Sequence, residues 1–529
     1  MLKKISGWTE TRAAFFWIFG LSAAIKLLTL LPDPVINRDG VLYISAARLF
    51  SDGHFREALT LYPAPAYPLV IAGAHAVFPG GWVAAARLVS LTAAILVLIP
   101  LYLLIRRLFD REAAWWGCLA FSVLPFTNES AVSVIRGPAF LFLFAWAVYF
   151  AARAVESPRI RFFLWAGLLS WGAICFRIEG VVLPAYGILF FTGLALWAKA
   201  DRRPFLAGLL TWTAVFLVPA VLFSAAAGHW GISGIRMDDV IRKLRHPAGA
   251  GLLDTYHRIY GQLKQMEQAS PWPSGKENFA EIARRFMPLV YVLGVLHALV
   301  KVIFPVFVVP LIQALRRPFG RTRLFVLLLA AAYLLMLYCR LITGDFIHSR
   351  FLLAPVLLLF PWVGAGIRNL FGAITRARRP GLTAAVLGIL FFVLPLYRIA
   401  HHAAGRDRVV MTAGRWLADR TDLHPLPMIT NDARIPFYAR KTAYMDWPVH
   451  LRDYPLLERT GVAKGMKLLA LRTALRKKGL IPEFRSFEKI KEFTGKEDVV
   501  IIYRFREPGG AVSPDSRPRT GSTLFRKEK

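Results

Sequence analysis

The stretch Asn37-Arg38-Asp39-Gly40-Val41-Leu42-Tyr43 follows the first apolar block of the chain and carries a carboxylate that could do chemistry. A carboxylate with access to water can serve as a general base or as a metal ligand. Asp39 also suits the N-cap of a helix that runs to about Phe50 and closes at Asp52-Gly53. The two roles are compatible, because one carboxylate oxygen can cap the helix while the other faces a cleft.

Other ionisable residues stand in short connections between apolar blocks. Arg136 precedes one block, and Arg177 and Glu179 separate two others. His348 and Arg350 stand in a further connection, at 340–350. A guanidinium group binds phosphate oxygens in a bidentate manner, so these arginines are candidate anion ligands. Ionisable groups at a membrane edge are functional candidates by default.

A divalent metal could take part, and the candidate ligands are Asp39 with Glu179 or His348. No spacing between these residues establishes such a site. The three cysteines lie inside or at the ends of apolar blocks and form no CxxC or Cys/His pattern, so a cysteine metal site and a disulfide framework are not expected.

The composition shows where these residues must be held. Of 529 residues 56% are hydrophobic and only 19% are charged, and Lys and Arg outnumber Asp and Glu by 66 to 33. The apolar residues form blocks long enough to cross a bilayer, which needs roughly 17–25 residues. A soluble enzyme, a disordered chain and a disulfide-stapled secreted module are therefore excluded.

The predicted fold class is mainly α, polytopic and integral to the membrane, with about eleven spans. These are expected near 13–31, 82–104, 113–127, 138–154, 162–176, 180–198, 205–225, 288–315, 324–340, 351–367 and 382–400. The apolar block at 65–79 contains three prolines and is better explained as a re-entrant or interfacial segment.

Basic residues predict the orientation. With the N-terminus in the cytoplasm, every second connection carries a Lys/Arg cluster, as the positive-inside rule expects for an inner (cytoplasmic) membrane protein. The net charge of +33 then needs no nucleic acid. Asp39, Arg136, Arg177 and Arg350 all fall on the outer side.

The same orientation gives a domain plan. Residues 1–400 form a transmembrane domain with a first outer loop at 32–81 and a long outer loop at 227–287. Residues 401–507 alternate helix-like and strand-like stretches, which predicts a small extracytoplasmic α/β domain. The Gly-, Pro- and Ser-rich end, 508–529, is expected to be a disordered tail.

Several motifs occur in a familiar order. They are Asp39-Gly40-x-x-Tyr43, the proline-rich stretch 61–69, Ala86-Arg87-Leu88-Val89-Ser90 before a long apolar block, the segment 133–137, Arg177-Ile178-Glu179-Gly180, and His348-Ser349-Arg350-Phe351-Leu352-Leu353-Ala354-Pro355. Together, over roughly residues 10–400, they resemble the polytopic GT-C glycosyltransferases of the protein-mannosyltransferase and aminoarabinose-transferase type.

The resemblance implies transfer of a sugar from a polyprenyl-phosphate carrier to a lipid, glycan or protein acceptor. It implies that Asp39 takes the proton from the acceptor hydroxyl, with inversion at the anomeric carbon. Arg136, Arg177, Arg350 and His348 would then lie near the phosphate. The list of candidate substrate-binding residues is completed by Arg38, Tyr43, Tyr67 and Glu179. Tyr43 and Tyr67 could stack on a sugar or belong to an interfacial aromatic belt.

Two positions depart from the family pattern. Ala64-Pro65-Ala66 stands where many relatives have Lys-Pro-Pro or an acidic residue, and Gly137 stands where many have an acidic residue. Arg136 could accordingly be a phosphate ligand or a membrane-edge anchor.

The alternative function is that of a polytopic transporter or lipid flippase without transferase activity. Such a protein would show ionisable residues in mid-span and paired halves. Only Lys26 lies clearly inside a span, and no internal repeat is evident.

Overall fold

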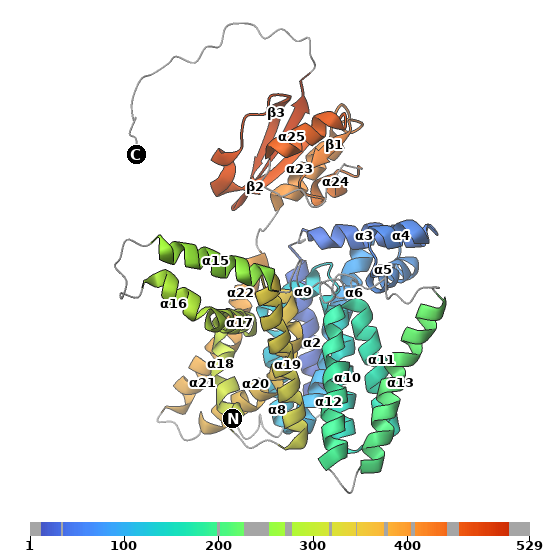
Figure 1. Cartoon of the computed structure of the whole chain (residues 1–529), viewed down its shortest axis with the longest axis vertical. Helices are drawn as coiled ribbons and strands as arrows, with labels where there is room; N and C mark the ends of the chain where they lie inside the picture. The colour runs from blue at the N-terminus through green and yellow to red at the C-terminus, as the bar shows by residue number, and fades with distance from the viewer. Residues whose placement is uncertain are drawn as a thin grey trace. The chain divides into compact units, whose positions relative to one another are not determined.

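The computed structural model describes residues 12–32, 35–197, 202–226, 253–269, 278–316, 320–344, 346–374, 379–403, 408–441 and 454–506 (Figure 1). The contacts between residues divide the chain into two compact units, Met1–Ala404 and Gly405–Lys529. The expected disordered tail at 508–529 and much of the expected loop at 227–287 lie outside the described residues.

The first unit is helical throughout its described residues. Its α-helices are α2 (Arg12–Leu30), α3 (Arg38–Ser51), α4 (Phe55–Leu61), α5 (Ala66–Val77), α6 (Trp82–Leu96), α7 (Leu98–Leu108), α8 (Arg111–Ser122), α9 (Pro125–Val132), α10 (Gly137–Glu156), α11 (Ile160–Phe176), α12 (Val182–Trp197), α13 (Arg202–Ala226), α15 (Asp254–Gln268), α16 (Phe279–Arg285), α17 (Met287–Ile303), α18 (Val308–Leu315), α19 (Arg321–Gly344), α20 (Leu353–Ala373), α21 (Pro380–Gly388) and α22 (Leu394–Ala403). Shorter turns are η1 (Ile178–Val181), η3 (Pro305–Phe307), η4 (Ser349–Leu352) and the π-helical η6 (Ile389–Val393).

Seven stretches of the described chain are long and apolar enough to cross a membrane, or eight if the bent pair α16–α17 is one span. They are Ala13–Leu30, Trp82–Leu108, Gly137–Glu156, Ile178–Trp197, Arg321–Gly344, Ser349–Ala373 and Pro380–His401. The chain is therefore a multi-pass membrane protein. The expected count of eleven is not reached by this measure; α8 has 12 residues, which is short for a span, and α11 has 17, at the lower limit.

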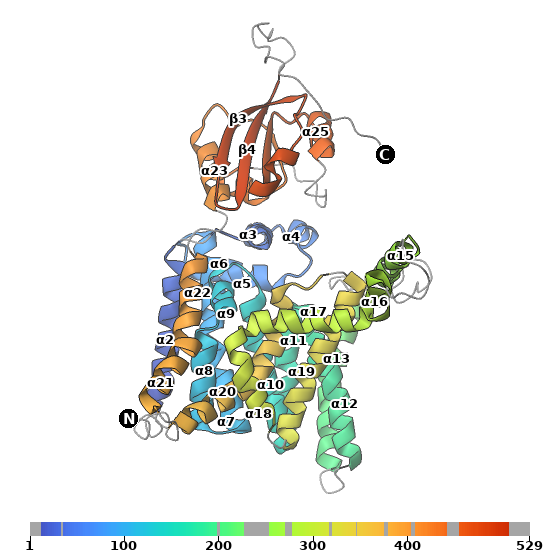
Figure 2. The same cartoon turned by 90° about the vertical axis from the view of Figure 1, so that its left-hand side faces the viewer.

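The single span expected at 288–315 is wrong. Helix α17 ends at Ile303, and Phe304 takes a left-handed backbone conformation with φ of 73° before Pro305 opens η3. A residue that precedes proline is disfavoured in the helical region, which explains the break. Helix α17 then runs across the neighbouring helices, whereas α18 runs along them (Figure 2).

The two ends of the first unit lie at opposite ends of α10. The 20 residues of α10 span about 30 Å. At its C-terminal end Glu156 accepts a 2.6 Å bond from the Arg107 guanidinium, and Arg323 donates to the carbonyl of Leu108 at 2.7 Å. Arg368 pairs with Asp110. Helices α3 and α4 lie across the other end, where α10 begins (Figure 1).

The interior of the first unit is a single apolar core of closely packed aliphatic and aromatic side chains. Lys26 is buried in α2, where its ammonium group donates to Ser22 Oγ at 2.9 Å and to Asn128 Oδ1 at 3.4 Å. Many large apolar side chains elsewhere are exposed, as expected for helices that face lipid.

The second unit contains a four-stranded sheet in the order β1-β2-β4-β3. Its elements are α23 (Arg408–Asp419), β1 (Met428–Thr430), α24 (Arg434–Tyr438), α25 (Tyr454–Ala463), β2 (Leu468–Ala474), the 3-10 turn η7 (Leu475–Leu480), β3 (Phe487–Thr494) and β4 (Asp498–Phe505). Strands β1 and β2 are parallel, while β4 pairs antiparallel with both β2 and β3.

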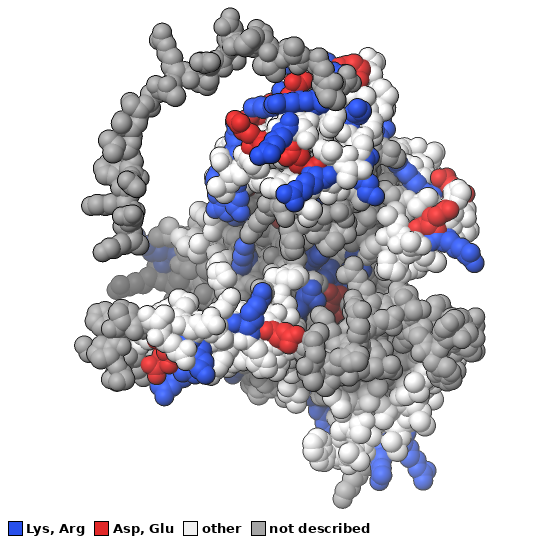
Figure 3. Space-filling view, turned by 45° about the horizontal axis from the view of Figure 1, so that its top comes forward, with Lys and Arg blue, Asp and Glu red and all other residues white. Residues whose placement is uncertain are grey.

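Alternation of side chains along β2 and β4 explains the layering of this unit. Leu468 and Ile502 point to the face covered by α23 and α24. Leu469 and Ile501 point to the opposite face, which is covered by α25. Beyond β1, the buried carboxylate of Asp432 accepts bonds from Arg434 at 2.8 Å and from Arg472 at 3.2 Å, and Arg472 also bonds Asp498 at 2.5 Å. Lys and Arg side chains (blue) are interspersed with fewer acidic ones on the described surface (Figure 3).

Candidate active site

Asp39 lies in the first turn of α3, at the end of the first unit where α10 begins. Asn37, not Asp39, occupies the N-cap position, so the N-cap role expected for Asp39 is wrong. A carboxylate within the first turn is still stabilised by the helix dipole. Its side chain forms an ion pair with Arg350, and both groups reach solvent, with 32% and 36% of their side-chain surfaces exposed.

Close backbone packing brings Asp39 to the neighbouring segments. A Cβ atom on Gly40 would lie 2.7 Å from Asn37 Oδ1 and 3.0 Å from Val134 Cβ, so only glycine lets α3 pack this closely on the segment that leads to Arg136. A Cβ atom on Gly137 would lie 2.9 Å from Leu353 Cδ1, close to η4. The two glycines thus allow three charged segments to converge.

Arg136 is half-buried beside this junction, with its guanidinium carbon 6.0 Å from the centre of the Tyr62 ring. Burial disfavours its charged form, but the phenols of Tyr43 and Tyr62 and the carboxylates of Glu179 and Asp39 outweigh burial and leave the pKa of Arg136 raised. Arg136 therefore carries a permanent positive charge next to Asp39.

Arg177 and Glu179 form a buried ion pair between α11 and α12. Arg177 Nη2 lies 3.1 Å from Glu179 Oε1, and only 3% and 11% of the two side chains are exposed. Tyr333 donates a 3.0 Å hydrogen bond to the Glu179 carbonyl and so fixes this turn to α19. Burial, reinforced by the charges of Arg136 and Arg350, lowers the pKa of Arg177, while Glu179 opposes that shift.

Arg340 joins the site from the last turns of α19, although it was not among the candidates from the sequence. Its guanidinium carbon lies 4.0 Å from the centre of the Phe351 ring, and it interacts electrostatically with Glu179 and Arg350. The sequence signal was present but weak, because a single arginine near the end of an apolar span is also typical of an interfacial anchor.

His348 lies between the rings of Phe346 and Phe351, at 5.9 and 6.3 Å between ring centres. Burial and the positive charges of Arg350 and Arg340 lower the pKa of His348 below its usual 6.5, although Asp39 opposes the shift. The imidazole is accordingly neutral at pH 7 and can accept or donate one proton in hydrogen bonds.

The remaining candidates lie around the charged group. Tyr43 and Tyr67 are buried, and the Tyr43 ring packs edge-on against Tyr62 and Tyr67 at 5.0 and 5.1 Å. The hydroxyl of Tyr67 lies 2.7 Å from Ser90 Oγ. Arg38 is the first residue of α3.

We refer to Arg136, Arg177, Arg340 and Arg350 as the arginine cluster. With the carboxylates of Asp39 and Glu179, and with a neutral His348, the group has a formal charge of +2. Such a group attracts an anion. It fits a metal cation poorly, because each carboxylate is already paired with an arginine and no three His, Cys, Asp or Glu side chains of the described chain are grouped as metal ligands.

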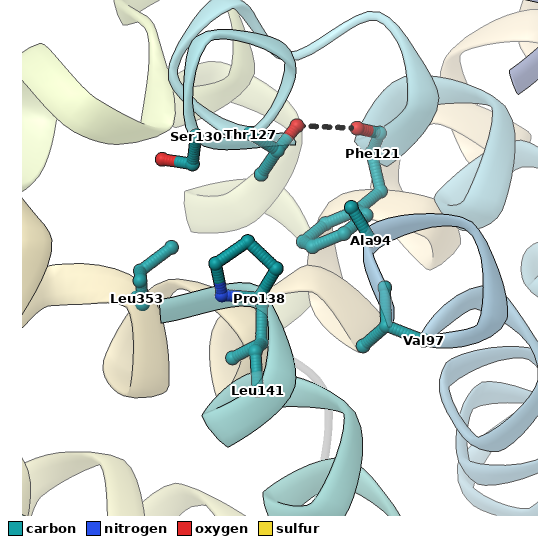
Figure 4. Close-up of a pocket in the computed structure, with 8 residues that line it drawn as sticks. All are labelled: Ala94, Val97, Phe121, Thr127, Ser130, Pro138, Leu141 and Leu353. Atoms are coloured by element: carbon teal, nitrogen blue, oxygen red, sulfur yellow. Dashed lines mark hydrogen bonds between the residues drawn. The ribbon is translucent and has the colours of Figure 1, made fainter. Parts of the chain in front are cut away.

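A small cavity elsewhere in the first unit is lined by apolar side chains that include residues of α6, α8, α10 and α20, with Thr127 and Ser130 from α9 (Figure 4). Its volume of about 10 Å³ is at the lower limit for holding a single water molecule. A sugar or a lipid chain cannot enter it.

Part of the chain matches a known protein family. Residues 63–227 match the family described as dolichyl-phosphate-mannose-protein mannosyltransferase, which covers less than half of the chain. None of the curated proteins matches the sequence.

The matches to solved structures cover more of the chain than the family match does. The crystal structure of ArnT from Cupriavidus metallidurans bound to undecaprenyl phosphate has a TM-score of 0.56 and 14% identity, over 93% of this chain and 98% of that one. An oligosaccharyltransferase from Archaeoglobus fulgidus in complex with Zn and sulfate has a TM-score of 0.56 and 13% identity, over 86% of this chain and 67% of that one. The chain therefore shares the fold of these two membrane proteins, and the family match over residues 63–227 supports the resemblance seen in the sequence motifs.

Proposed function

We propose that this protein is a membrane glycosyltransferase that moves a sugar from a polyprenyl-phosphate-linked donor to a hydroxyl group of a lipid, glycan or protein acceptor. The observation that carries the proposal is the position of Asp39 beside the arginine cluster, at one end of a GT-C fold. A carboxylate and an anion site side by side are what such a transfer requires.

In the proposed reaction Asp39 accepts the proton of the acceptor hydroxyl while that oxygen attacks the anomeric carbon. The bond between the anomeric carbon and the phosphate oxygen breaks, and its electrons stay with the phosphate. Attack from the side opposite the leaving group inverts the configuration. Tyr43 and Tyr67, which are buried, would hold α3 in place rather than stack on the sugar.

The charge of the site suits the leaving group. A terminal phosphate carries about two negative charges near neutral pH. The formal charge of +2 on the site would neutralise this group; Arg350 pairs with the proposed base, and Arg136 interacts with it electrostatically. Preorganised positive groups that face the developing charge lower the barrier without reorganisation.

The ion pair between Asp39 and Arg350 gives donor binding a second effect. A phosphate oxygen would compete with Asp39 for the Arg350 guanidinium, because both are oxyanions. Asp39 would then be released to accept a proton only when the donor is in place. A divalent metal is not needed in this scheme, because the arginine cluster provides the positive charge.

We further propose that the reaction takes place on the outer face of the cytoplasmic membrane, with the N-terminus inside. Arg107, Arg323 and Arg368 lie at the end of the first unit opposite the site, as the positive-inside rule requires of cytoplasmic residues. Residues 1–400 would form the catalytic domain and residues 401–507 an extracytoplasmic domain.

Mass spectrometry of envelope glycolipids tests the proposal. Cells that produce the protein are compared with cells that lack it and with cells that produce Asp39→Asn. We expect a product that carries one extra sugar only with the active protein. Asp52→Asn, an exposed carboxylate at the other end of α3, is the matched control and should retain the product. An unchanged product pattern in the Asp39→Asn cells would exclude Asp39 as the base.

A further inference from the structure

One aromatic ring of the site touches three members of the arginine cluster. The centre of the Phe351 ring lies 4.0 Å from the guanidinium carbon of Arg340, 5.2 Å from that of Arg177 and 5.7 Å from that of Arg350. The three arginines come from three different places: the end of α19, the turn after α11, and η4. The ring itself is buried.

Three guanidinium groups so close together repel one another. Two carboxylates of the site reduce this repulsion, since Asp39 pairs with Arg350 and Glu179 with Arg177. No carboxylate of the described chain forms an ion pair with Arg340. The negative face of an aromatic ring attracts cations within about 6 Å, so the Phe351 ring at 4.0 Å stabilises Arg340 more closely than the Phe346 ring at 5.5 Å.

Two polar atoms of the site lack a hydrogen-bond partner within the described chain. Arg340 Nε and Glu179 Oε2 are buried and have no hydrogen-bond partner among the described residues. A buried donor without a partner is costly, which indicates that a ligand satisfies it. An acceptor oxygen is what Arg340 lacks, and a phosphate oxygen would fill that role.

We propose that Arg340 is a further phosphate-binding residue, and that Phe351 is a positioning residue that holds Arg177, Arg340 and Arg350 ready for the phosphate. This inference rests on the proposed function, because it assigns these residues to the phosphate head group of the donor. It adds to the proposed function that the Phe351 ring, which has no hydrogen-bonding atom, determines the affinity for the anion.

Direct binding tests the inference without turnover. The purified full-length protein in detergent is titrated with a fluorescent short-chain polyprenyl phosphate. Phe351→Leu removes the ring face, and we expect it to weaken binding about tenfold. Phe351→Tyr keeps the ring and should restore affinity to within about twofold. Phe346→Leu is the matched control. The centre of the Phe346 ring lies 5.5 Å from the guanidinium carbon of Arg340, and within the arginine cluster this ring contacts only that residue.

Arg340→Gln tests the proposed phosphate contact of Arg340 and leaves the Phe351 ring in place. It still tests the proposal if a Phe351 variant does not fold. We expect binding about tenfold weaker, with the dependence on salt concentration reduced. In transfer assays Phe351→Leu and Arg340→Gln should each raise the KM for the donor more than they lower kcat.

The outcomes are distinct. Wild-type affinity in folded Phe351→Leu and in Arg340→Gln would overturn the inference and leave the proposed function intact. Failure of the wild-type protein to bind the probe would instead contradict the proposed donor class. Equal weakening by Phe346→Leu and Phe351→Leu would show general loosening of the site and would overturn the role of Phe351.

Discussion

The buried pair Arg177–Glu179 gives a sharp test of the electrostatics of the site. Arg177→Met removes the charge and keeps a long unbranched side chain, and Glu179→Gln removes the opposite charge. Breaking a buried ion pair costs about 3–5 kcal/mol, whereas an exposed pair contributes about 0–1 kcal/mol. With 3% and 11% of the two side chains exposed, this pair belongs to the first class.

The two substitutions should not cost the same. Arg177→Met leaves Glu179 within the field of Arg136, and it relieves repulsion between Arg177 and its neighbours Arg136 and Arg350. We expect this substitution to lower the free energy of unfolding by about 3 kcal/mol or less. Glu179→Gln leaves Arg177 buried among like charges, and we expect about 4–5 kcal/mol.

Unfolding by sodium dodecyl sulfate in mixed micelles, followed by tryptophan fluorescence, measures both changes. The double variant Arg177→Met/Glu179→Gln completes a cycle and should cost less than the sum of the single substitutions. Arg107→Met breaks the more exposed pair with Glu156 and serves as the control, with about 0–1 kcal/mol. A larger cost for Arg177→Met than for Glu179→Gln, or costs as small as that of the control for both, would show that buried charge does not govern the stability of this pair.

Three further predictions concern Asp432, Lys26 and His348. Asp432→Ala leaves the buried Arg434 without its carboxylate and should destabilise the second unit by about 3–5 kcal/mol, seen as faster hydrogen exchange of β1 and β2 in the full-length protein. Lys26→Met should keep the transfer rate within about threefold, because methionine fills the same space and Lys26 bonds Ser22 and Asn128, neither of which belongs to the arginine cluster; loss of activity would instead show that the mid-span charge is needed for transfer. The pKa of His348 is lower in the folded protein than its usual 6.5, so its contribution to stability is complete above pH 6.5 and is lost as the pH falls through the folded pKa. Unfolding at pH 7.5 and pH 5 should therefore show a smaller loss of stability on acidification for His348→Gln than for the wild-type protein.

The sequence predicted that the charged residues of the site lie together, because the basic clusters of the chain indicate which connections share one side of the membrane. Asp39, Arg136, Arg177 and Arg350 all stand in connections that the positive-inside rule assigns to one side, and the structure brings them into mutual electrostatic contact. Their distances depend on tertiary packing, such as the contact of Gly40 with Val134, which no local pattern encodes.

Other features could not be predicted, for identifiable reasons. The span expected at 288–315 failed because apolar composition is the same in a helix that crosses the bundle and in one that runs along it; only the break at Phe304 distinguishes the two. Arg340 was missed because its role comes from a contact with Phe351, eleven residues away and beyond the end of α19. Tyr43 and Tyr67 carried no sign of their burial, since tyrosine is frequent both in cores and at membrane interfaces.

The central claim, that Asp39 is the base of a transfer from a lipid-phosphate donor, is tested most directly by one paired measurement on Asp39→Asn. The rate of sugar transfer and the affinity for polyprenyl phosphate are determined on the same purified protein. General-base catalysis contributes about 10²–10⁴-fold, so the rate should fall by a factor in that range while the affinity for the phosphate stays the same or increases, because Arg350 is freed. A transfer rate close to that of the wild-type protein would contradict the claim.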